Sequence, residues 1–241
     1  MAGTRLAVRL GRVRPADLNE CFDRGHESAN IHDVRTNRLD DRSLSAVVFD
    51  IGGVLLDWDP RHLYRKLISD PAEMEWFLAN VCTPQWHEKH DRGLSTADSC
   101  AALAAEWPQY AGLILAWSER GEEMVAGPLP DGVKLLRQVS GSGLPCYGLT
   151  NMEAETYPKR LARFDFLRCL TGTVVSGFEG IAKPDRAIYE LLLHRFGLDA
   201  ATTLFIDDCA VNVAAAADAG MQAMVYRGPG PVRSRLGWPA S

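Results

Sequence analysis

The most informative residue of this 241-residue chain is a carboxylate, Asp50, which directly follows a short apolar run. Residues 46–49 are apolar and include β-branched side chains, which is typical of a buried strand in a parallel sheet. An Asp at the carboxyl end of such a strand projects into the crevice where open α/β sheets bind ligands. The following glycines, Gly52 and Gly53, let backbone approach a bound group closely. The pattern suits a carboxylate nucleophile or a metal ligand, although an Asp that caps a turn would have the same local sequence.

Three later segments place polar groups at the end of a strand or just before a helix, where parallel sheets present functional groups. The residues concerned are Thr150 and Asn151, Lys183, and the adjacent acids Asp207 and Asp208. Apolar strands over 145–149 and 203–206 precede the two pairs, and Lys183 stands just before a helix start at Asp185. Taken singly, each has an ordinary explanation as a turn residue, a solvated lysine or a helix N-cap.

In this order, the four positions resemble the motifs of the haloacid dehalogenase superfamily, whose members are mostly phosphatases that act through an aspartyl-phosphate. The resemblance runs from about residue 44 to residue 226. It implies an α/β fold, a doubly wound, Rossmann-like parallel sheet with an inserted α-helical cap of the C1 type. The segment 86–93 looks similar to the cap of bacterial sugar-phosphatase-like members.

The resemblance also implies roles in phosphoryl transfer. Asp50 would attack phosphorus and form a phospho-aspartate that water hydrolyses, while Lys183 would neutralise the phosphate and hold Asp50 ionised. Thr150 and Asn151 would donate hydrogen bonds to phosphate oxygens. The Asp50 carboxylate and the phosphate are both anions and must approach each other, so a hard divalent cation, Mg²⁺, is expected. Its expected oxygen ligands are Asp50, the backbone carbonyl of Gly52, Asp208 directly, and Asp207 nearby through water or hydrogen bonds.

One position departs from the phosphatase pattern. Phosphatases of this family usually carry a second Asp two residues after the nucleophile as the general acid, and this chain has Gly52 there. Loss of a general acid typically costs about 10²–10⁴ in rate, and less when the leaving group is already good. His87, His90 or Asp57 would be replacements, but exposed polar residues of the cap would give the same sequence. Asn212 is either a residue that orients the metal-binding acid or an exposed helix residue.

The remaining pattern predicts the elements that hold these groups. Residues 59–126 have helical spacing, with acid–proline helix starts at Asp59 and Asp70. They form the expected cap, whereas residues 44–58 and 127–241 form the expected core. Large aromatic side chains dominate small helical cores. We therefore expect five tryptophans to fill the cap interior, with stacking on a substrate as the alternative for Trp58 or Trp86; the five are Trp58, Trp76, Trp86, Trp107 and Trp117.

After Pro130 the chain returns to alternating strands and helices, which implies a parallel sheet. Strands are expected over 172–176 and 222–226, and helices over 185–196 and 210–219.

Composition limits the function classes. The net charge of −5 argues against a general nucleic-acid binder, and no apolar run approaches the roughly 20 residues of a membrane span. The start of the chain lacks an apolar signal region, and six cysteines without metal-like spacing suggest a reducing compartment, so a cytoplasmic protein is expected. Residues 1–43 mix arginines with acids and are expected to be a disordered or artefactual extension.

The leading interpretation is a cytoplasmic, Mg²⁺-dependent phosphatase of a small phosphorylated metabolite, acting as a monomer or homodimer. A second interpretation is a 2-haloacid dehalogenase-like hydrolase, in which Asp50 displaces halide from carbon. That chemistry needs no metal, so Lys183 and the intact Asp207–Asp208 pair argue against it. A third is a catalytically weak binding or interaction protein of the same fold, for which Gly52 is the one supporting feature.

Overall fold

The computed structural model describes residues 43–239, and its centre is one parallel sheet of five strands. The order across the sheet is β5 (Gly172–Val175), β4 (Cys146–Thr150), β1 (Ala46–Phe49), β6 (Thr203–Asp207) and β7 (Gln222–Val225). Chain order runs outward from β1 through β4 to β5, then restarts at β6 on the other side of β1. The carboxyl end of β1 is therefore a topological switch point, and the predicted doubly wound sheet is confirmed.

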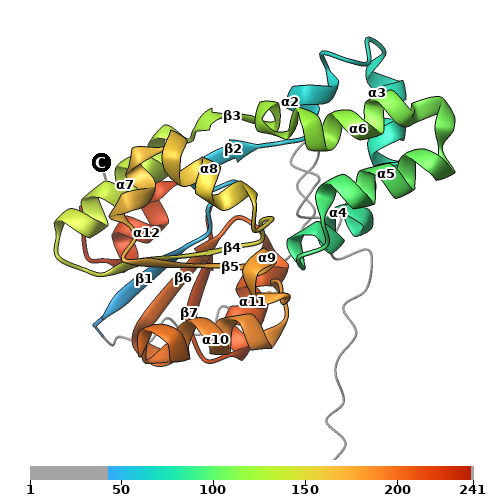
Figure 1. Cartoon of the computed structure of the whole chain (residues 1–241). Coiled ribbons are helices and arrows are strands. Elements are labelled where there is room, and N and C mark those ends of the chain that lie inside the picture. The colour runs from blue at the N-terminus through green and yellow to red at the C-terminus, as the bar shows by residue number, and fades with distance from the viewer. Residues whose placement is uncertain (1–42, 240–241) are drawn as a thin grey trace, which may run out of the picture.

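Helices cover both faces of this sheet (Figure 1). One face carries α7 (Pro130–Gly141), α8 (Thr156–Arg163) and α12 (Pro229–Arg235), and the other carries α10 (Arg186–Phe196) and α11 (Ala210–Asp218). Side chains alternate along a strand, so β1 supplies both cores. Phe49 packs with the cluster that includes Leu136 of α7, whereas Val48 packs with Ile188 of α10.

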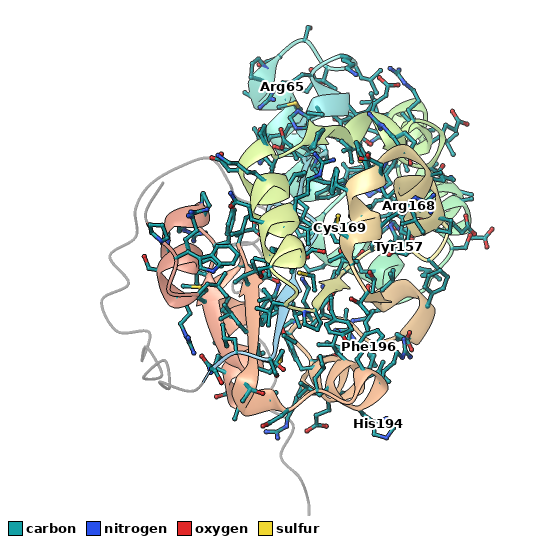
Figure 2. The ribbon with its side chains drawn as sticks, turned by 90° about the vertical axis from the view of Figure 1, so that its left-hand side faces the viewer. Arg65, Tyr157, Arg168, Cys169, His194 and Phe196 are labelled. Carbon is teal, nitrogen blue, oxygen red and sulfur yellow. The ribbon has the colours of Figure 1, made fainter. Side chains whose placement is uncertain are left out.

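The ring of Phe196 holds α10 against β4 and β5. Phe196, the last residue of α10 (Figure 2), stacks on Tyr147 of β4 with ring centroids 4.6 Å apart. A Cβ atom at Gly172 would lie 2.5 Å from the Phe196 ring, so the close approach of helix and strand requires glycine there. Tyr157 of α8 donates a 2.9 Å hydrogen bond to Thr173 on β5.

A two-stranded antiparallel ribbon, β2 (Leu56–Trp58) and β3 (Val125–Pro128), leads out of the core into an inserted helical cap (Figure 1). The cap helices are α2 (Arg61–Tyr64), α3 (Pro71–Asn80), α4 (Pro84–Asp91), α5 (Thr96–Glu106) and α6 (Ala111–Glu119). Asp70 caps α3 as predicted, accepting a hydrogen bond from the Ala72 amide. At α2 the helix begins one residue later than predicted, and Asp59 accepts from the Arg61 amide instead.

The tryptophans do not all fill the cap. Trp86 and Trp117 are buried in its core, and Trp58 and Trp107 pack against it. The prediction is wrong for Trp76, which is 43% exposed. The buried face of α3 is set by Met74, Phe77 and Leu78, and Trp76 lies outside it, with its half-exposed ring against Trp107 and Tyr110. A count of aromatic residues does not distinguish these two faces.

Apart from Ser43, the N-terminal segment for which an extension was expected lies outside the described residues. Among the helices of residues 43–239, none combines the length and the apolar character needed to cross a bilayer.

Candidate active site

The carboxyl ends of the three central strands gather the predicted residues at one edge of the sheet. Phe49 pairs with Ile206 on β6 and with Gly148 on β4, so the next residue, Asp50, lies between these two strands. Its backbone N–H donates a 2.9 Å hydrogen bond to the Ile206 carbonyl. Thr150 and Asp207 are the last residues of β4 and β6. Strand pairing therefore brings together residues that are far apart in the sequence.

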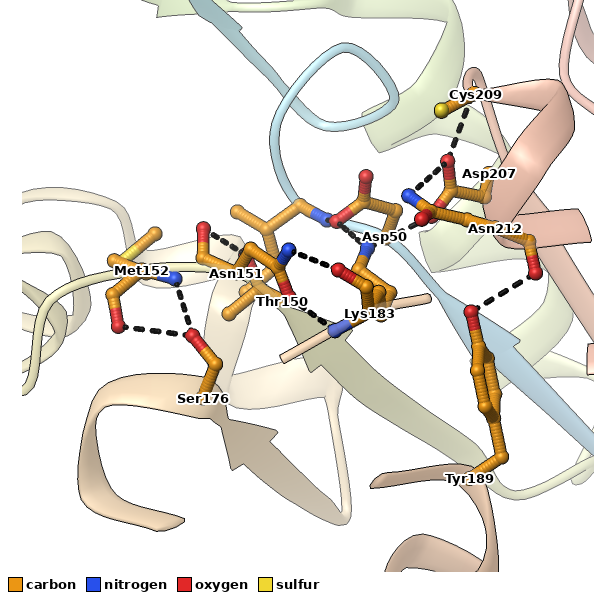
Figure 3. Close-up of polar contacts among 11 residues, drawn as sticks. Asp50, Thr150, Asn151, Met152, Ser176, Lys183, Tyr189, Asp207, Cys209 and Asn212 are labelled. Atoms are coloured by element: carbon orange, nitrogen blue, oxygen red, sulfur yellow. Dashed lines mark hydrogen bonds and ion pairs between the residues drawn. The ribbon is translucent and has the colours of Figure 1, made fainter. Parts of the chain in front are cut away.

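Lys183 lies between two carboxylates. Its Nζ is 2.8 Å from Oδ1 of Asp50 and donates a 2.7 Å hydrogen bond to Oδ2 of Asp207 (Figure 3). The Lys183 side chain is 1% exposed, so neither interaction is screened by bulk water. Burial alone would lower the pKa of Lys183, but Asp207 and Asp50 together raise it, and the residue remains a cation.

Asn151 fixes the backbone of this lysine. Its side-chain Oδ1 accepts a 2.8 Å hydrogen bond from the Lys183 amide, and its Nδ2 donates a 2.9 Å bond to the Lys183 carbonyl (Figure 3). One of the two N–H groups of the Asn151 amide is thus already committed. Thr150, which is 1% exposed, lines the adjoining cavity. The predicted contacts of Thr150 and Asn151 with phosphate oxygens stay predictions.

Asp207 is fully buried and its two oxygens are both engaged. Besides the bond from Lys183, they accept hydrogen bonds from the Cys209 amide at 2.7 Å and from Asn212 Nδ2 at 3.1 and 3.2 Å (Figure 3). Asn212 is held in turn because its carbonyl accepts a 2.9 Å bond from the Tyr189 hydroxyl. Asn212 is thus 8% exposed rather than an exposed helix residue, and it orients Asp207.

The acids at this edge can hold a divalent cation. Asp50, Asp207 and Asp208 each offer an oxygen, and these oxygens lie within 4.8 Å of one another. Asp207 is saturated and does not line the cavity, whereas Asp50 and the half-buried Asp208 do, together with Gly52. Hard cations such as Mg²⁺ prefer oxygen ligands of this kind.

The electrostatics of Asp50 favour a bound cation. Burial raises its pKa well above the ordinary range, Asp207 and Asp208 add to the rise, and Lys183 opposes it. A cation at this position would supply the charge that keeps Asp50 ionised.

A cavity of about 340 Å³ lies over these groups, between the core and the cap. Its floor is polar, with Asp50, Thr150, Lys183 and Asp208. Its upper wall contains apolar side chains from the ribbon and the cap, namely Leu56, Trp58, Trp117, Met124 and Val125. A cavity of this size and mixed lining is typical of a site for a small molecule.

The three replacement candidates for the missing acid occupy different places. His87 lines the cavity and stacks on Trp58, with ring centroids 5.1 Å apart. His90 is fully buried, so the expectation of an exposed cap residue is wrong for it. Asp57 lies 3.2 Å from Nε2 of His62 and is not part of the described cavity lining.

Of the cap carboxyls on the cavity, none of which was predicted, Asp91 is the buried one. Asp91 is the last residue of α4 and is 8% exposed. Its signal was the spacing of four residues from His87, which places both side chains on one face of the helix.

Ion pairs fasten the cap to the core. Arg92, just after α4, lies 2.6 Å from Asp185 of the core and 2.9 Å from Glu88. At Gly93, which has φ +91°, a Cβ atom would lie 3.0 Å from the Gly177 carbonyl. Arg160 of α8 pairs with Glu122 at the other end of the cap. These contacts hold both ends of the cap against the core beside the cavity.

Comparison with known proteins gives consistent matches. Residues 44–220 match the haloacid dehalogenase-like hydrolases. The sesquiterpene phosphatase astK of Aspergillus oryzae is 29% identical over 179 residues, which cover 74% of this chain and 88% of that protein.

Solved structures agree in fold. The HAD family enzyme bt-2542 of Bacteroides thetaiotaomicron gives a TM-score of 0.62 at 16% identity, covering 80% of this chain and 98% of that one. The same enzyme has been crystallised with magnesium and inorganic phosphate. The L-2-haloacid dehalogenase of Xanthobacter autotrophicus gives a TM-score of 0.52 at 19% identity, covering 75% and 76%.

Proposed function

The chain belongs to the haloacid dehalogenase-like hydrolases, and we propose that it is a Mg²⁺-dependent phosphatase that cleaves a small phosphorylated metabolite through an aspartyl-phosphate. The observation that carries the proposal is the position of Lys183 between Asp50 and Asp207, at the floor of a cavity that the cap helps to line. Phosphoryl transfer needs groups that position the phosphate and neutralise its charge, and these residues provide both.

In the first half of the reaction, an Asp50 oxygen attacks phosphorus while the bond from phosphorus to the leaving-group oxygen breaks. Lys183 places a fixed positive charge beside the attacking carboxylate and the phosphate. The free N–H of the Asn151 amide and the Thr150 hydroxyl would hold phosphate oxygens. In the second half, water attacks the phosphorus of the phospho-aspartate and regenerates Asp50. Mg²⁺, held by Asp50, Asp208 and the Gly52 carbonyl, would supply further neutralisation of the phosphate charge.

The proposed use of Mg²⁺ draws support from two sources. The three clustered acids fit a hard cation, and a protein of this fold has been crystallised with magnesium and inorganic phosphate.

A dehalogenase remains the alternative, since one shares this fold. The cavity floor disfavours it. The three clustered acids outnumber the one ammonium that lies between two of them, so without a cation the floor would repel the carboxylate of a haloacid.

The body of the substrate is proposed to be apolar and terpenoid-like. Trp58, Trp117 and Met124 form the apolar part of the upper wall, which also carries cap carboxyls. An apolar group of a substrate gains about 25 cal/mol of binding free energy for each Å² of its surface that such a wall removes from water. The relative astK, whose name describes a sesquiterpene phosphatase, supports the same choice.

The test is phosphate release from a sesquiterpenyl monophosphate, a sugar 1-phosphate and an acyl phosphate, each with Mg²⁺ and with EDTA. We expect Mg²⁺-dependent release with the terpenyl ester preferred over the sugar ester. Preference for the sugar ester would overturn the substrate class, and equal release in EDTA would overturn the metal requirement.

A further inference from the structure

A phosphatase built on Asp50 needs a proton donor for the leaving group, and Gly52 provides no side chain for that purpose. The cavity that contains Asp50 and Gly52 on its core side is lined on its cap side by a second buried carboxyl, Asp91. We propose that Asp91, at the end of cap helix α4, is the general acid that protonates the leaving group. This proposal rests on the proposed phosphatase function.

The position of Asp91 is fixed by the contacts of its neighbours. Arg92 is pinned to Asp185 of the core and to Glu88 of the same helix. Gly93 approaches the Gly177 backbone closely. At the other end of α4, the Thr83 hydroxyl accepts a hydrogen bond from the Trp86 amide and starts the helix. The carboxyl end of α4 is therefore held against the core, and Asp91 is presented to the cavity rather than to solvent.

The groups around Asp91 favour its protonated form. Burial raises its pKa well above the ordinary range. Glu153, from the loop after β4, and Glu88 raise it further, whereas Lys183 and Arg92 lower it. The remaining neighbour is His87, whose Nδ1 lies 3.8 Å from Asp91 Oδ2. A neutral carboxyl can donate a proton, which an ionised one cannot.

The neighbouring histidines are poorer donors. Burial lowers the pKa of His87 and of His90 to about 4, so both imidazoles are neutral near pH 7. His90 is also absent from the described lining of the cavity.

The proton balance closes over the two steps. As Asp50 attacks and the bond from phosphorus to the leaving oxygen breaks, that oxygen takes the proton of Asp91 and departs as an alcohol. Asp91 is left as a carboxylate. It then accepts a proton from the water that attacks the phospho-aspartate, so that phosphate, Asp50 and protonated Asp91 are restored.

A substitution at Gly52 tests directly whether a cap residue supplies the general acid. A Cβ atom added at Gly52 meets no atom within 4 Å, so the position can accept a side chain. Gly52→Asp would place a carboxyl where phosphatases of the family usually carry their acid. It should therefore compensate for the loss of Asp91.

The experiment compares Asp91→Asn with Asp98→Asn, a change of an exposed acid on cap helix α5. Each is assayed in Mg²⁺ on an alkyl phosphate, whose leaving group needs a proton, and on p-nitrophenyl phosphate, whose leaving group does not. Asp91→Asn should lower kcat/KM about 10²–10⁴-fold for the alkyl ester and less than about tenfold for the aryl ester. Asp98→Asn should change neither.

Retained aryl activity shows that Asp91→Asn is folded and that the phosphatase itself is intact. The double variant Gly52→Asp, Asp91→Asn should recover alkyl turnover. An equal loss with both esters, or no loss with either, would overturn the role of Asp91. Wild-type phosphate release that survives Asp50→Asn would instead overturn the proposed function, so the two failures are distinguishable.

Discussion

Lys183 donates a 2.7 Å hydrogen bond to Asp207, and this bond connects the lysine that faces Asp50 to a carboxylate that is closed to solvent. Asp207 is saturated by Lys183, Asn212 and the Cys209 amide. Its neighbour Asp208 lines the cavity. The two adjacent acids thus have different roles. Asp207 holds Lys183 in place, and Asp208 is exposed to a ligand in the cavity.

This difference predicts separate effects on stability. Asp207→Asn removes a charged partner of a buried ammonium and should lower the free energy of unfolding by about 3 kcal/mol. Asp208→Asn, at a half-buried position, should lower it by less than about 1 kcal/mol while removing Mg²⁺-dependent activity. Urea denaturation of both variants in EDTA measures the difference. Equal losses of stability would contradict the assignment.

The apolar wall predicts a specific effect of Trp58→Ala. Trp58 lines the cavity, so its loss should raise KM for a terpenyl phosphate about tenfold or more, consistent with removal of about 1.5–3 kcal/mol of burial. KM for a sugar phosphate should change less. Trp76→Ala is the matched control because Trp76 lies on the outer surface of the cap. Steady-state kinetics with both esters checks this, and an equal effect of the two substitutions would contradict it.

The ion pair between Arg92 and Asp185 predicts an effect on cap closure rather than on stability. Both side chains are about one-third exposed or more, at 32% and 41%, so Asp185→Asn should cost less than about 1 kcal/mol of stability. It should still raise KM several-fold, because the cap closes less firmly over the substrate. Glu190→Gln, which removes the exposed pair with Arg186, is the control and should leave KM unchanged. Thermal denaturation and KM, measured together, separate the two effects.

The lowered pKa of the buried His90 leads us to expect a loss of stability in mild acid. It is fully buried, with its Nδ1 3.9 Å from Glu153 and its ring 4.4 Å from that of Trp86, and burial lowers its pKa to about 4. The unfolded chain, with an ordinary pKa near 6.5, takes up the proton first as the pH falls. The stability associated with neutral His90 is therefore present above about pH 6.5 and is lost as the pH falls toward about 4.

The measurement is the thermal midpoint across this pH range for His90→Leu and for His194→Leu. Both nitrogens of His90 lack hydrogen-bond partners within residues 43–239, so leucine leaves no buried partner unsatisfied. His90→Leu should weaken the pH dependence without abolishing it, because burial also lowers the pKa of His87 to about 4, whereas substitution of the exposed His194 on α10 (Figure 2) should leave it unchanged. A parallel dependence in the two variants would rule out His90 as the source.

Much of the fold followed from local sequence. The apolar run before Asp50, the run before Asp207 and the alternation of strands with helices are enough to predict a parallel sheet, because strand ends share one edge. The inserted helices were predictable from caps such as Asp70. These features depend on short stretches of sequence, so they can be predicted without knowledge of tertiary contacts.

The contacts between distant segments were not predictable in the same way. Asn151 was expected to bind phosphate, yet its side chain also clamps the backbone of Lys183, which is 32 residues away. Asp91 was missed and Trp76 was misassigned for a related reason. Helical spacing shows which residues share a face, but it does not show what that face meets.

The most direct test of the account is to trap the phosphorylated enzyme. Rapid acid quenching during turnover of a phosphomonoester in Mg²⁺, followed by mass spectrometry of peptides, should find phosphate on Asp50. The label should be absent in Asp50→Asn, and it should accumulate more slowly in Lys183→Met, where the positive charge beside Asp50 is lost. Phosphate release by Asp50→Asn at the wild-type rate, with no phosphorylated peptide in either protein, would contradict the account.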